Sequence, residues 1–440
     1  MNYSELAYFG GEPTVKKIKP HLEWPYLSDN CINEVTQYLK DRKPLSIADG
    51  SGVVFELEQV IKDYFGIDYV LTTNSGSNAL HSAYVALNLK VGSEVIVPVS
   101  TFHASITPAI HCGLTPVLVD VSSETGNISP SAILEAITEK TSCIVVTHMF
   151  GHPVDLNEIV EICNRHGLKL IEDCSHSFGS TYFDRKVGTF GDVAVFSMQA
   201  TKTVPAGEGG FLITSDRDIY ERACLLGHYR GRSARDVQDP FLKQFAETGY
   251  GLKYRIHPLA AVIAKNEFLQ LEKRISERNR ITSVISQGLE ESNGIIPPII
   301  KEYVTMGGFF GYRARYIENK LFINDRPISV DEYIGILQSE GLEVHRPSVP
   351  PLDQMPIFRH NYVGLEYANH WKPRLLEPYL GAREFYKNLI SIPSFMSLDS
   401  LPLINEYIKA IKKVSNILSP VTLQYKVGQH THGLNDERPR

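Results

Sequence analysis

The sequence predicts an α/β fold in which helices cover both faces of a mainly parallel sheet. Short runs rich in β-branched residues alternate with helical patterns from Tyr69 to Thr214, which is typical of such a sheet. Polar and glycine-rich stretches follow several of these runs, at the strand ends where sheets of this kind bind ligands. The strand-like runs are Tyr69–Leu71, Glu94–Val99, Pro116–Asp120, Cys143–His148, Leu168–Asp173, Val193–Met198 and Gly210–Thr214.

Helical patterns occupy several of the intervals between these runs. The clearest are Ala79–Leu89, Ser131–Thr138 and Asp155–His166, the last followed by Gly167 as a stop signal. Further along, apolar residues at helical spacing predict one long helix over His257–Gly288. This helix would link the large domain to a smaller one.

The most informative stretch runs from Phe196 to Gly210. Lys202 stands there between a strand-like run and the glycine-rich turn Gly207-Glu208-Gly209-Gly210, where the backbone could closely approach a bulky group. We interpret Lys202 as a Schiff-base lysine. A lysine at this place could also be an ordinary solvated residue.

Two further predicted strands end in polar residues that could belong to the same site as Lys202. Leu168–Asp173 is followed by Cys174-Ser175-His176, and Thr72–Leu80 places Ser75-Gly76-Ser77 before a helical run. A helix N-terminus binds phosphate through its free N–H groups. Together, a phosphate turn, a carboxylate and a lysine amine are what pyridoxal phosphate requires. Taken singly, Asp173 could be a helix cap, and the turn Ser75-Gly76-Ser77 could also cap a helix without binding a ligand.

These motifs resemble those of the DegT/DnrJ/EryC1/StrS family of pyridoxal-phosphate-dependent sugar and cyclitol aminotransferases, over about Leu6 to Ser419. The resemblance implies the aspartate-aminotransferase-like type I fold. It assigns the catalytic roles to Lys202, Asp173 and His176, with Asp173 at the pyridine nitrogen and His176 at the phenolic oxygen side. It assigns phosphate binding and ring stacking to Ser75, Gly76, Ser77, Ser197 and Phe102, the last in Thr101-Phe102.

The sequence departs from the family pattern at two places. Lys253 in Gly251-Leu252-Lys253-Tyr254-Arg255 replaces an asparagine that reaches the cofactor phosphate of the neighbouring subunit, so Lys253 could bind that phosphate by its charge or be a surface lysine. Asp353 follows Leu352 where relatives often carry histidine. Sugar dehydratases of this fold have histidine in place of the lysine, and Lys202 therefore argues against their reaction.

The resemblance implies an aminotransferase that takes the amino group of L-glutamate or L-glutamine. The acceptor would be a keto sugar or a keto-cyclitol in amino-sugar biosynthesis, and the enzyme would be a homodimer with shared active sites. Two alternatives stay open: another pyridoxal reaction such as aldol cleavage or elimination, and a regulatory protein without turnover. The runs His228–Arg232 and His345–Arg346 could bind substrate carboxylate or phosphate, or could be surface charge.

Composition excludes several other classes. The net charge of −6 over 440 residues indicates no basic surface for nucleic acid. We expect no membrane span, because no run approaches the roughly 20 apolar residues that one needs. The N-terminus shows no signal peptide, so we expect a cytoplasmic location. The six cysteines lack paired spacing and indicate neither disulfides nor a metal site. Cys174 is either a packing residue or a reactive thiol.

We predict three parts. Residues 1–265 form an N-terminal arm and the large PLP-binding domain, and residues 266–425 form a small α+β domain. Residues 426–440 form a polar tail that we expect to be disordered. The tail contains His430 and His432, which are either metal ligands or solvated side chains.

Overall fold

The computed structural model describes residues 2–16, 24–362 and 365–419. The predicted tail, with His430 and His432, lies outside the described residues. No helix in the described part of the chain combines the length and the apolar character needed to cross a bilayer.

An eight-stranded sheet forms the centre of the larger unit, in the order β1-β9-β8-β5-β4-β2-β3-β15. Only β9 runs antiparallel to its neighbours, and the remaining pairs are parallel, which confirms the predicted mainly parallel sheet. The strands are β1 Tyr69–Thr73, β2 Glu94–Pro98, β3 Thr115–Val119, β4 Thr141–Thr147, β5 Lys169–Asp173, β8 Val193–Ser197, β9 Gly210–Thr214 and β15 Arg374–Leu375.

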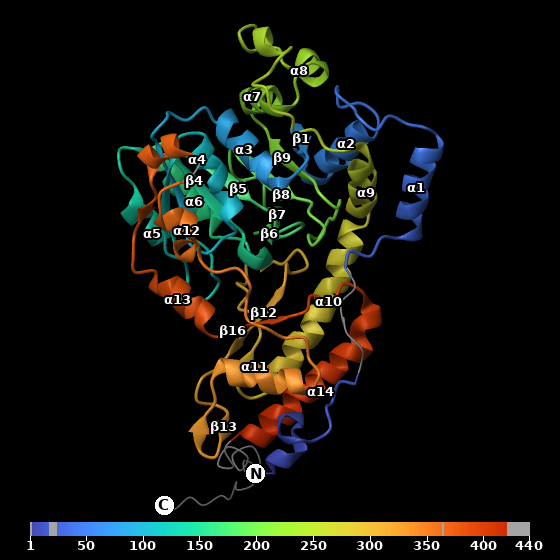
Figure 1. The fold of residues 1–440 in the computed structure, drawn as a ribbon, viewed down its shortest axis with the longest axis vertical. Coiled ribbons are helices and arrows are strands. Elements are labelled where there is room, and N and C mark those ends of the chain that lie inside the picture. Colours follow the sequence, from blue (N-terminus) through green and yellow to red (C-terminus); the bar gives the residue numbers. More distant parts are fainter. Residues whose placement is uncertain (1, 17–23, 363–364, 420–440) are drawn as a thin grey trace, which may run out of the picture.

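Helices cover both faces of this sheet, as Figure 1 shows. Along β8, Val193 and Val195 pack in the core on one face, whereas Ala194 and Phe196 pack in the core on the other. Burial on both sides explains why the strands are apolar throughout and do not alternate with polar residues. One face carries α3 Gly76–Ala86, α4 Thr107–His111 and α7 Arg217–Gly227, and the other α2 Val53–Phe65, α5 Pro130–Ala136, α6 Leu156–His166 and α9 Pro258–Leu269.

The prediction of a single long helix over His257–Gly288 is wrong, because this segment forms two helices. Helix α9 ends at Leu269 and α10 spans Leu271–Glu290. Between them, the N–H of Gln270 donates to the carbonyl of Glu267, three residues back, at 3.2 Å. This tight turn interrupts the regular helical ladder. Helix α10 then continues into the smaller unit (Figure 1).

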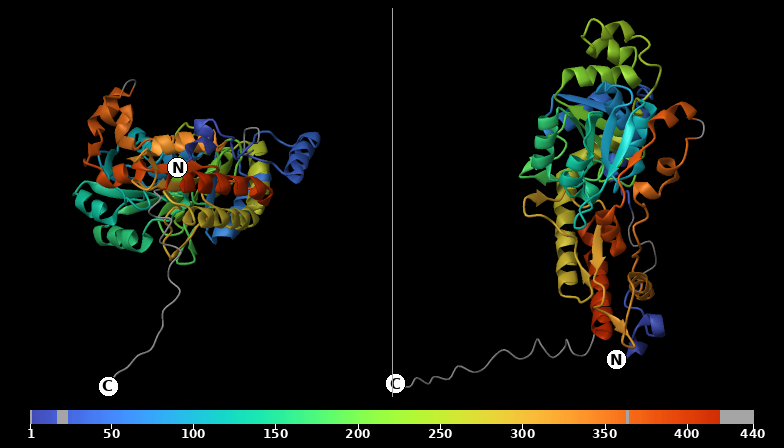
Figure 2. Two further views of the ribbon diagram at one scale, coloured as in Figure 1. Left: turned by 90° about the horizontal axis from the view of Figure 1, so that it is seen from below. Right: turned by 90° about the vertical axis from the view of Figure 1, so that its left-hand side faces the viewer.

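The smaller unit is α+β, as predicted. Its three-stranded sheet, in the order β10-β12-β16, packs with α10, α11 and α14. The right-hand view of Figure 2 shows this unit at one end of the larger one. The bounds of these elements are β10 Ile295–Ile296, β12 Tyr312–Tyr316, α11 Val330–Ser339, β16 Leu389–Ile392 and α14 Leu401–Leu418.

Two segments pack against a different unit from the one that their position in the chain suggests. The N-terminal arm lies against the small unit, where Ala7 and Thr14 donate backbone N–H groups to the buried carboxylate of Glu340 at 2.9 and 3.0 Å. Conversely, β15 pairs with β3 of the large sheet, and Leu352 packs in the large-sheet core. The division of the chain at residues 265 and 425 stays a prediction.

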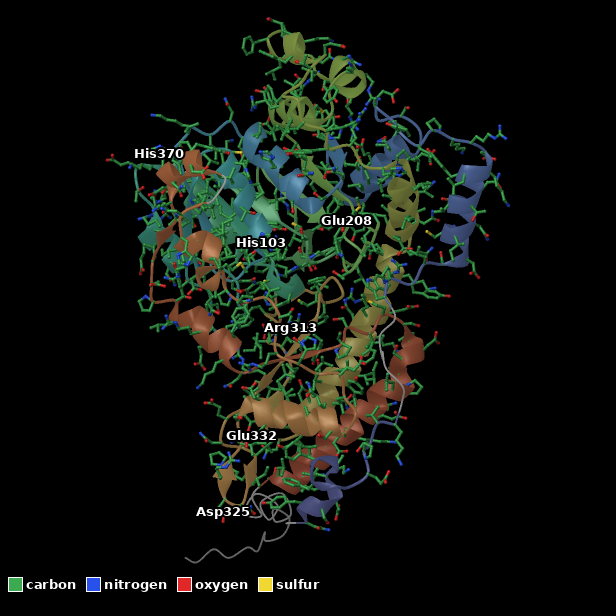
Figure 3. The ribbon with its side chains drawn as sticks, in the orientation of Figure 1. His103, Glu208, Arg313, Asp325, Glu332 and His370 are labelled. Carbon is green, nitrogen blue, oxygen red and sulfur yellow. The ribbon has the colours of Figure 1, made fainter. Side chains whose placement is uncertain are left out.

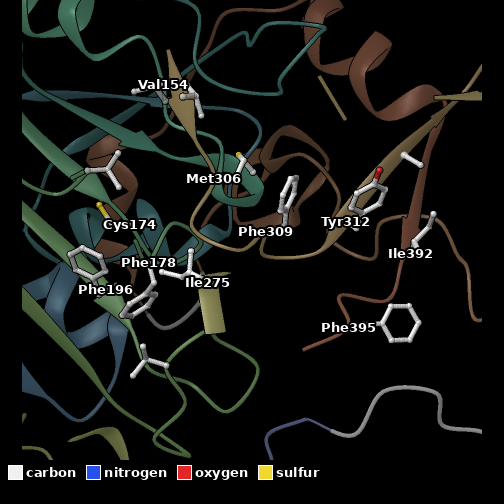
Figure 4. Packing of buried hydrophobic residues seen from close by; sticks show 14 of the residues in the cluster. Val154, Cys174, Phe178, Phe196, Ile275, Met306, Phe309, Tyr312, Ile392 and Phe395 are labelled. Atoms are coloured by element: carbon white, nitrogen blue, oxygen red, sulfur yellow. The ribbon is translucent and has the colours of Figure 1, made fainter. Parts of the chain in front are cut away.

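One hydrophobic core runs through both units. Figure 4 shows this core as a series of side chains from Phe196 through Phe178 and Ile275 to Phe309 and Tyr312. Phe196 stacks on Phe211 with ring centroids 4.7 Å apart. This packed aromatic support holds β8 in place, just before the strand leads into the loop that carries Lys202.

Candidate active site

A cavity of about 330 Å³ opens where several parallel strands end. Thr147 ends β4, Asp173 ends β5 and Ser197 ends β8, while Ser75 follows shortly after β1. All the predicted cofactor-binding residues except Lys253 line this cavity. The structure therefore brings together residues that lie far apart in the sequence: Ser75, Gly76, Ser77, Phe102, Asp173, His176, Ser197 and Lys202.

One end of the cavity is the N-terminus of helix α3. Ser75 is its N-cap, and its hydroxyl accepts the N–H of Asn78 at 3.1 Å. A β-carbon on Gly76 would lie 2.6 Å from the β-carbon of Ser197, and one on Gly210 would lie 2.5 Å from the Gly76 nitrogen. Glycine at both positions lets two backbones and a hydroxyl converge on one point. The free N–H groups of the helix make this end suitable for a phosphate.

Asp173 also lines the cavity and is only 4% exposed. Ser105 donates its hydroxyl to Asp173 Oδ2 at 2.6 Å, and the N–H of Ser175 donates to Oδ1 at 3.1 Å. Thr101 Oγ1 lies 2.7 Å from both Ser105 Oγ and Thr147 Oγ1, so three hydroxyls support the carboxylate. A buried carboxylate held in this way presents a fixed negative charge to the cavity.

His176 lies between aromatic rings in the same cavity wall. Its ring stacks on Phe310 at 4.1 Å and lies parallel to Phe150 at 6.3 Å. Burial lowers the pKa of His176 well below the ordinary value, and the charges of Lys202 and Arg313 act in the same direction. Its Nδ1 is buried without a partner among the described residues. A neutral imidazole with one free nitrogen is ready to bond an added group.

The amine of Lys202 contacts no acid among the residues that the structure describes. Its Nζ lies 4.1 Å from the centroid of the Phe310 ring. Burial lowers the pKa of Lys202 to about 8, although the charge of Asp173 opposes this shift. A lysine that loses its proton this readily supplies the neutral amine that nucleophilic and base chemistry requires.

This shift predicts how Lys202 responds to pH. In the protein without cofactor, labelling of Lys202 by acetic anhydride should speed up as pH rises and level off above about 8, because the neutral amine is then the main form. Mass spectrometry of the Lys202 peptide measures it. A rate that still climbs steeply at about pH 10, where ordinary lysines titrate, would contradict the prediction.

Phe102 and Phe310 supply the aromatic walls. Phe102 lines the cavity and is 46% exposed, an unfavourable position for a large apolar ring unless a planar group covers it. Phe310 was not singled out from the sequence. The signal for it was the glycine-flanked stretch Gly307-Gly308-Phe309-Phe310-Gly311, which is typical of tightly packed backbone.

The loop that carries Phe310 is anchored to both units. Gly307 donates its N–H to the hydroxyl of Ser180 at 2.9 Å, close beyond Asp173, and Phe310 donates its N–H to the carbonyl of Phe150 at 3.2 Å. The buried Arg278 of α10 bonds the carbonyl of Phe309 and the hydroxyl of Thr203. These bonds hold the Phe310 ring against Lys202 and His176.

Several candidates from the sequence lie outside this cavity. Lys253 is exposed, Arg232 pairs at 2.8 Å with Glu58 in the larger unit, and Arg346 donates to the carbonyl of Leu389 at 3.3 Å. Asp353 is buried beside Arg359, at 3.4 Å. The runs His228–Arg232 and His345–Arg346 thus do not reach the cavity lining.

A buried group behind the cavity is structural. His148, Glu172 and Cys174 offer ligand atoms within 4.8 Å of one another. Burial alone would raise the pKa of Glu172, but His148 and the N–H groups of Gly188 and Gly191 bond the carboxylate and hold its pKa below the ordinary value. Burial raises the pKa of the Cys174 thiol well above its ordinary value, which favours its packing role.

The residues of the cavity fit pyridoxal phosphate. Gly76 and Gly210 let the start of α3 pack closely against Ser197 and β9, where a β-carbon would collide with protein atoms, and the free N–H groups of this helix N-terminus suit a phosphate. The Nδ1 of His176 is buried without a partner among the described residues. Phe102 offers an exposed ring for stacking, and Asp173 and Lys202 supply the charge and the amine.

Comparison with known proteins agrees with this fit. The sequence model of the DegT/DnrJ/EryC1/StrS aminotransferase family matches residues 26–387. GDP-perosamine synthase of Escherichia coli O157:H7 is 35% identical over 243 residues, which are 55% of this chain and 65% of that protein. L-glutamine:scyllo-inosose aminotransferase of Streptomyces griseus is 29% identical over 424 residues, 93% of this chain and 97% of that one.

A solved structure of an aminotransferase from Psychrobacter cryohalolentis has the same fold, with a TM-score of 0.77 at 22% identity, over 91% of this chain and 100% of that one. The chain therefore belongs to the DegT/DnrJ/EryC1/StrS family and is a pyridoxal-phosphate-dependent aminotransferase of the aspartate-aminotransferase-like fold.

Proposed function

We propose that the protein transfers the amino group of L-glutamate or L-glutamine to a keto sugar or keto-cyclitol in amino-sugar or aminocyclitol biosynthesis. The observation that carries the proposal is the placement of Lys202 and Asp173 in one cavity with the phosphate-binding turn. The relatives support it, because their names describe a perosamine synthase and an inosose aminotransferase. We also infer that the enzyme works in the cytoplasm.

Each group of residues in the cavity would have its own role in the reaction. Pyridoxal phosphate, when bound, supplies an aldehyde that binds amines and a ring that withdraws electrons. Ser75, Gly76, Ser77 and Ser197 would hold its phosphate, and Phe102 would stack on its ring. Asp173 would keep a positive charge on the ring nitrogen through its fixed carboxylate.

Lys202 has two tasks at different stages. Its amine would hold the cofactor, and the same amine, when free, would accept the proton from the donor α-carbon. The pKa of about 8 suits this task, since an appreciable fraction of the amine is neutral near neutral pH. His176, neutral and packed against Phe310, would orient the oxygen side of the ring.

The test is a two-stage assay on the enzyme loaded with cofactor. L-glutamate or L-glutamine is added first, and the 2-oxo acid product and the change in cofactor absorbance are measured. Scyllo-inosose and a nucleotide-linked 4-keto hexose are then offered separately as acceptors, and the aminated product is detected by mass spectrometry. We expect 2-oxo acid in the first stage and one aminated product in the second.

The two alternatives give other results in this assay. A regulatory protein would bind cofactor and show no absorbance change with either donor. An enzyme for elimination or aldol cleavage would release ammonia or an aldehyde in place of a 2-oxo acid. Either outcome would refute the proposal.

We further propose a homodimer in which Lys253 binds the cofactor phosphate in the partner's site. A mixture of Lys202→Ala and Lys253→Ala chains should then regain about a quarter of the wild-type activity at limiting cofactor, because half of the dimers would contain one intact site. Each variant alone should show little activity under these conditions. No regain in mixed dimers verified by two affinity tags would contradict the role of Lys253.

A further inference from the structure

Arg313 is a cation without a counter-ion beside the active site. It lies on β12, between the two units and on the small-unit side of the strand ends (Figure 3). No ion pair joins it to any acid of the described residues, and its Nε is buried without an acceptor there. Burial lowers the pKa of Arg313 to about 10, which reflects this lack of compensation. A buried polar group left unpaired destabilises a fold unless a ligand satisfies it.

A second unpartnered group lies directly opposite. Arg313 faces Ser391 across the β12–β16 pair, and the Ser391 hydroxyl is also buried without a partner among the described residues. Cross-strand partners project to the same face of a sheet. On the opposite face, Tyr312 and Ala314 pack in the core, so Arg313 and Ser391 project away from that core. A guanidinium and a hydroxyl together suit a small planar anion.

The position of Arg313 relates this pair to the reacting atoms. The Arg313 guanidinium lies 4.6 Å from the Phe150 ring centroid, and its charge contributes to lowering the pKa of His176. Arg313 also follows closely after Phe310, which contacts both His176 and Lys202. Arg313 and Phe150 line a separate cavity of about 40 Å³, and Phe310, three residues before Arg313 in the chain, lines the cofactor cavity.

Other nearby cations are already engaged. Arg278 bonds Phe309 and Thr203, Arg315 donates to the carbonyls of Ser123 and Glu124, and Lys202 is the reacting amine. The cavity lining otherwise offers Asp173 and Glu208, both acidic. An amino-acid donor brings a carboxylate into this site, and the described lining provides no cation for it other than the reacting lysine.

We propose that Arg313, with Ser391, binds a carboxylate of the amino-acid donor. The inference rests on the proposed aminotransfer. The guanidinium matches a carboxylate through two parallel N–H bonds. In a nucleotide-linked acceptor, the sugar separates the phosphates from the keto carbon that reacts. In glutamate, by contrast, both carboxylates lie within a few bonds of the reacting α-carbon. An anion site this close to His176 therefore suits the donor.

The test uses the cofactor-loaded enzyme and three variants: Arg313→Gln, Arg313→Lys and the matched control Arg315→Gln from the same strand face. The apparent dissociation constant of L-glutamate is measured from the rate of the donor half-reaction. It should rise about 10- to 100-fold in Arg313→Gln, less in Arg313→Lys, and stay near wild type in Arg315→Gln. L-glutamine and the α-amide of glutamate, each lacking one carboxylate, show which of the two Arg313 binds.

Calorimetric binding of glutarate provides a readout without turnover. Arg313→Gln should weaken glutarate binding relative to Arg315→Gln. Unchanged donor and glutarate affinities would overturn the proposal, as would a defect confined to the acceptor half-reaction. If the wild type binds glutarate through Arg313 but no donor reacts, the proposed function fails and the carboxylate site stands.

Discussion

Replacing Lys202 with alanine is expected to lower the rate of aminotransfer by about 10⁴-fold, because in the proposed mechanism one amine would serve both as the covalent attachment and as the proton acceptor. The cofactor should still bind, since the phosphate turn at Ser75–Ser77 and the Phe102 wall do not depend on Lys202. Single-turnover absorbance with L-glutamate measures the rate.

A small amine provides the control for this variant. Methylamine at high concentration should restore part of the rate in Lys202→Ala, because it can enter the vacated space and accept the proton. Circular dichroism verifies that the variant is folded. A Lys202→Ala variant with a rate within about tenfold of the wild type would show that another group is the base, and the assignment of Lys202 would be wrong.

Replacing Asp173 with asparagine should lower kcat by about 10²- to 10³-fold with a much smaller change in cofactor affinity. The asparagine is of the same size and keeps a carbonyl oxygen for the Ser105 hydroxyl, but it removes the negative charge that would stabilise a protonated ring nitrogen in the proposed mechanism. Steady-state kinetics at saturating donor and acceptor, with cofactor affinity from absorbance titration, separate the two effects.

Two further variants refine this prediction. Asp173→Glu retains the charge in a displaced position and should be less impaired than Asp173→Asn. Ser105→Ala removes one bond to the carboxylate and should have a smaller effect still, since Ser175 and the fixed end of β5 continue to hold Asp173. A kcat for Asp173→Asn equal to that of the wild type would mean that the charge does not act on the ring.

Much of the large unit was predictable because its signals are local. The predicted run Gly210–Thr214 is β9 without change of bounds, and Asp155–His166 differs from α6 by one residue, with Gly167 in the left-handed conformation at its end. Strands buried on both faces must be apolar throughout, and a helix stop requires a residue that tolerates positive φ. The linking helix was less predictable, because the local geometry at Gln270 leaves no compositional signal.

By itself, the sequence determined the α/β class and predicted that Lys202, Asp173, Ser75–Ser77 and Ser197 lie at or just beyond strand ends, where the structure places them in one cavity. Only the tertiary structure decided which other groups meet them. Phe310 and Arg313 come from the small unit, and Ser105 reaches Asp173 across the edge of the sheet. Contacts between segments so far apart depend on how the two units pack, and no local pattern encodes that packing.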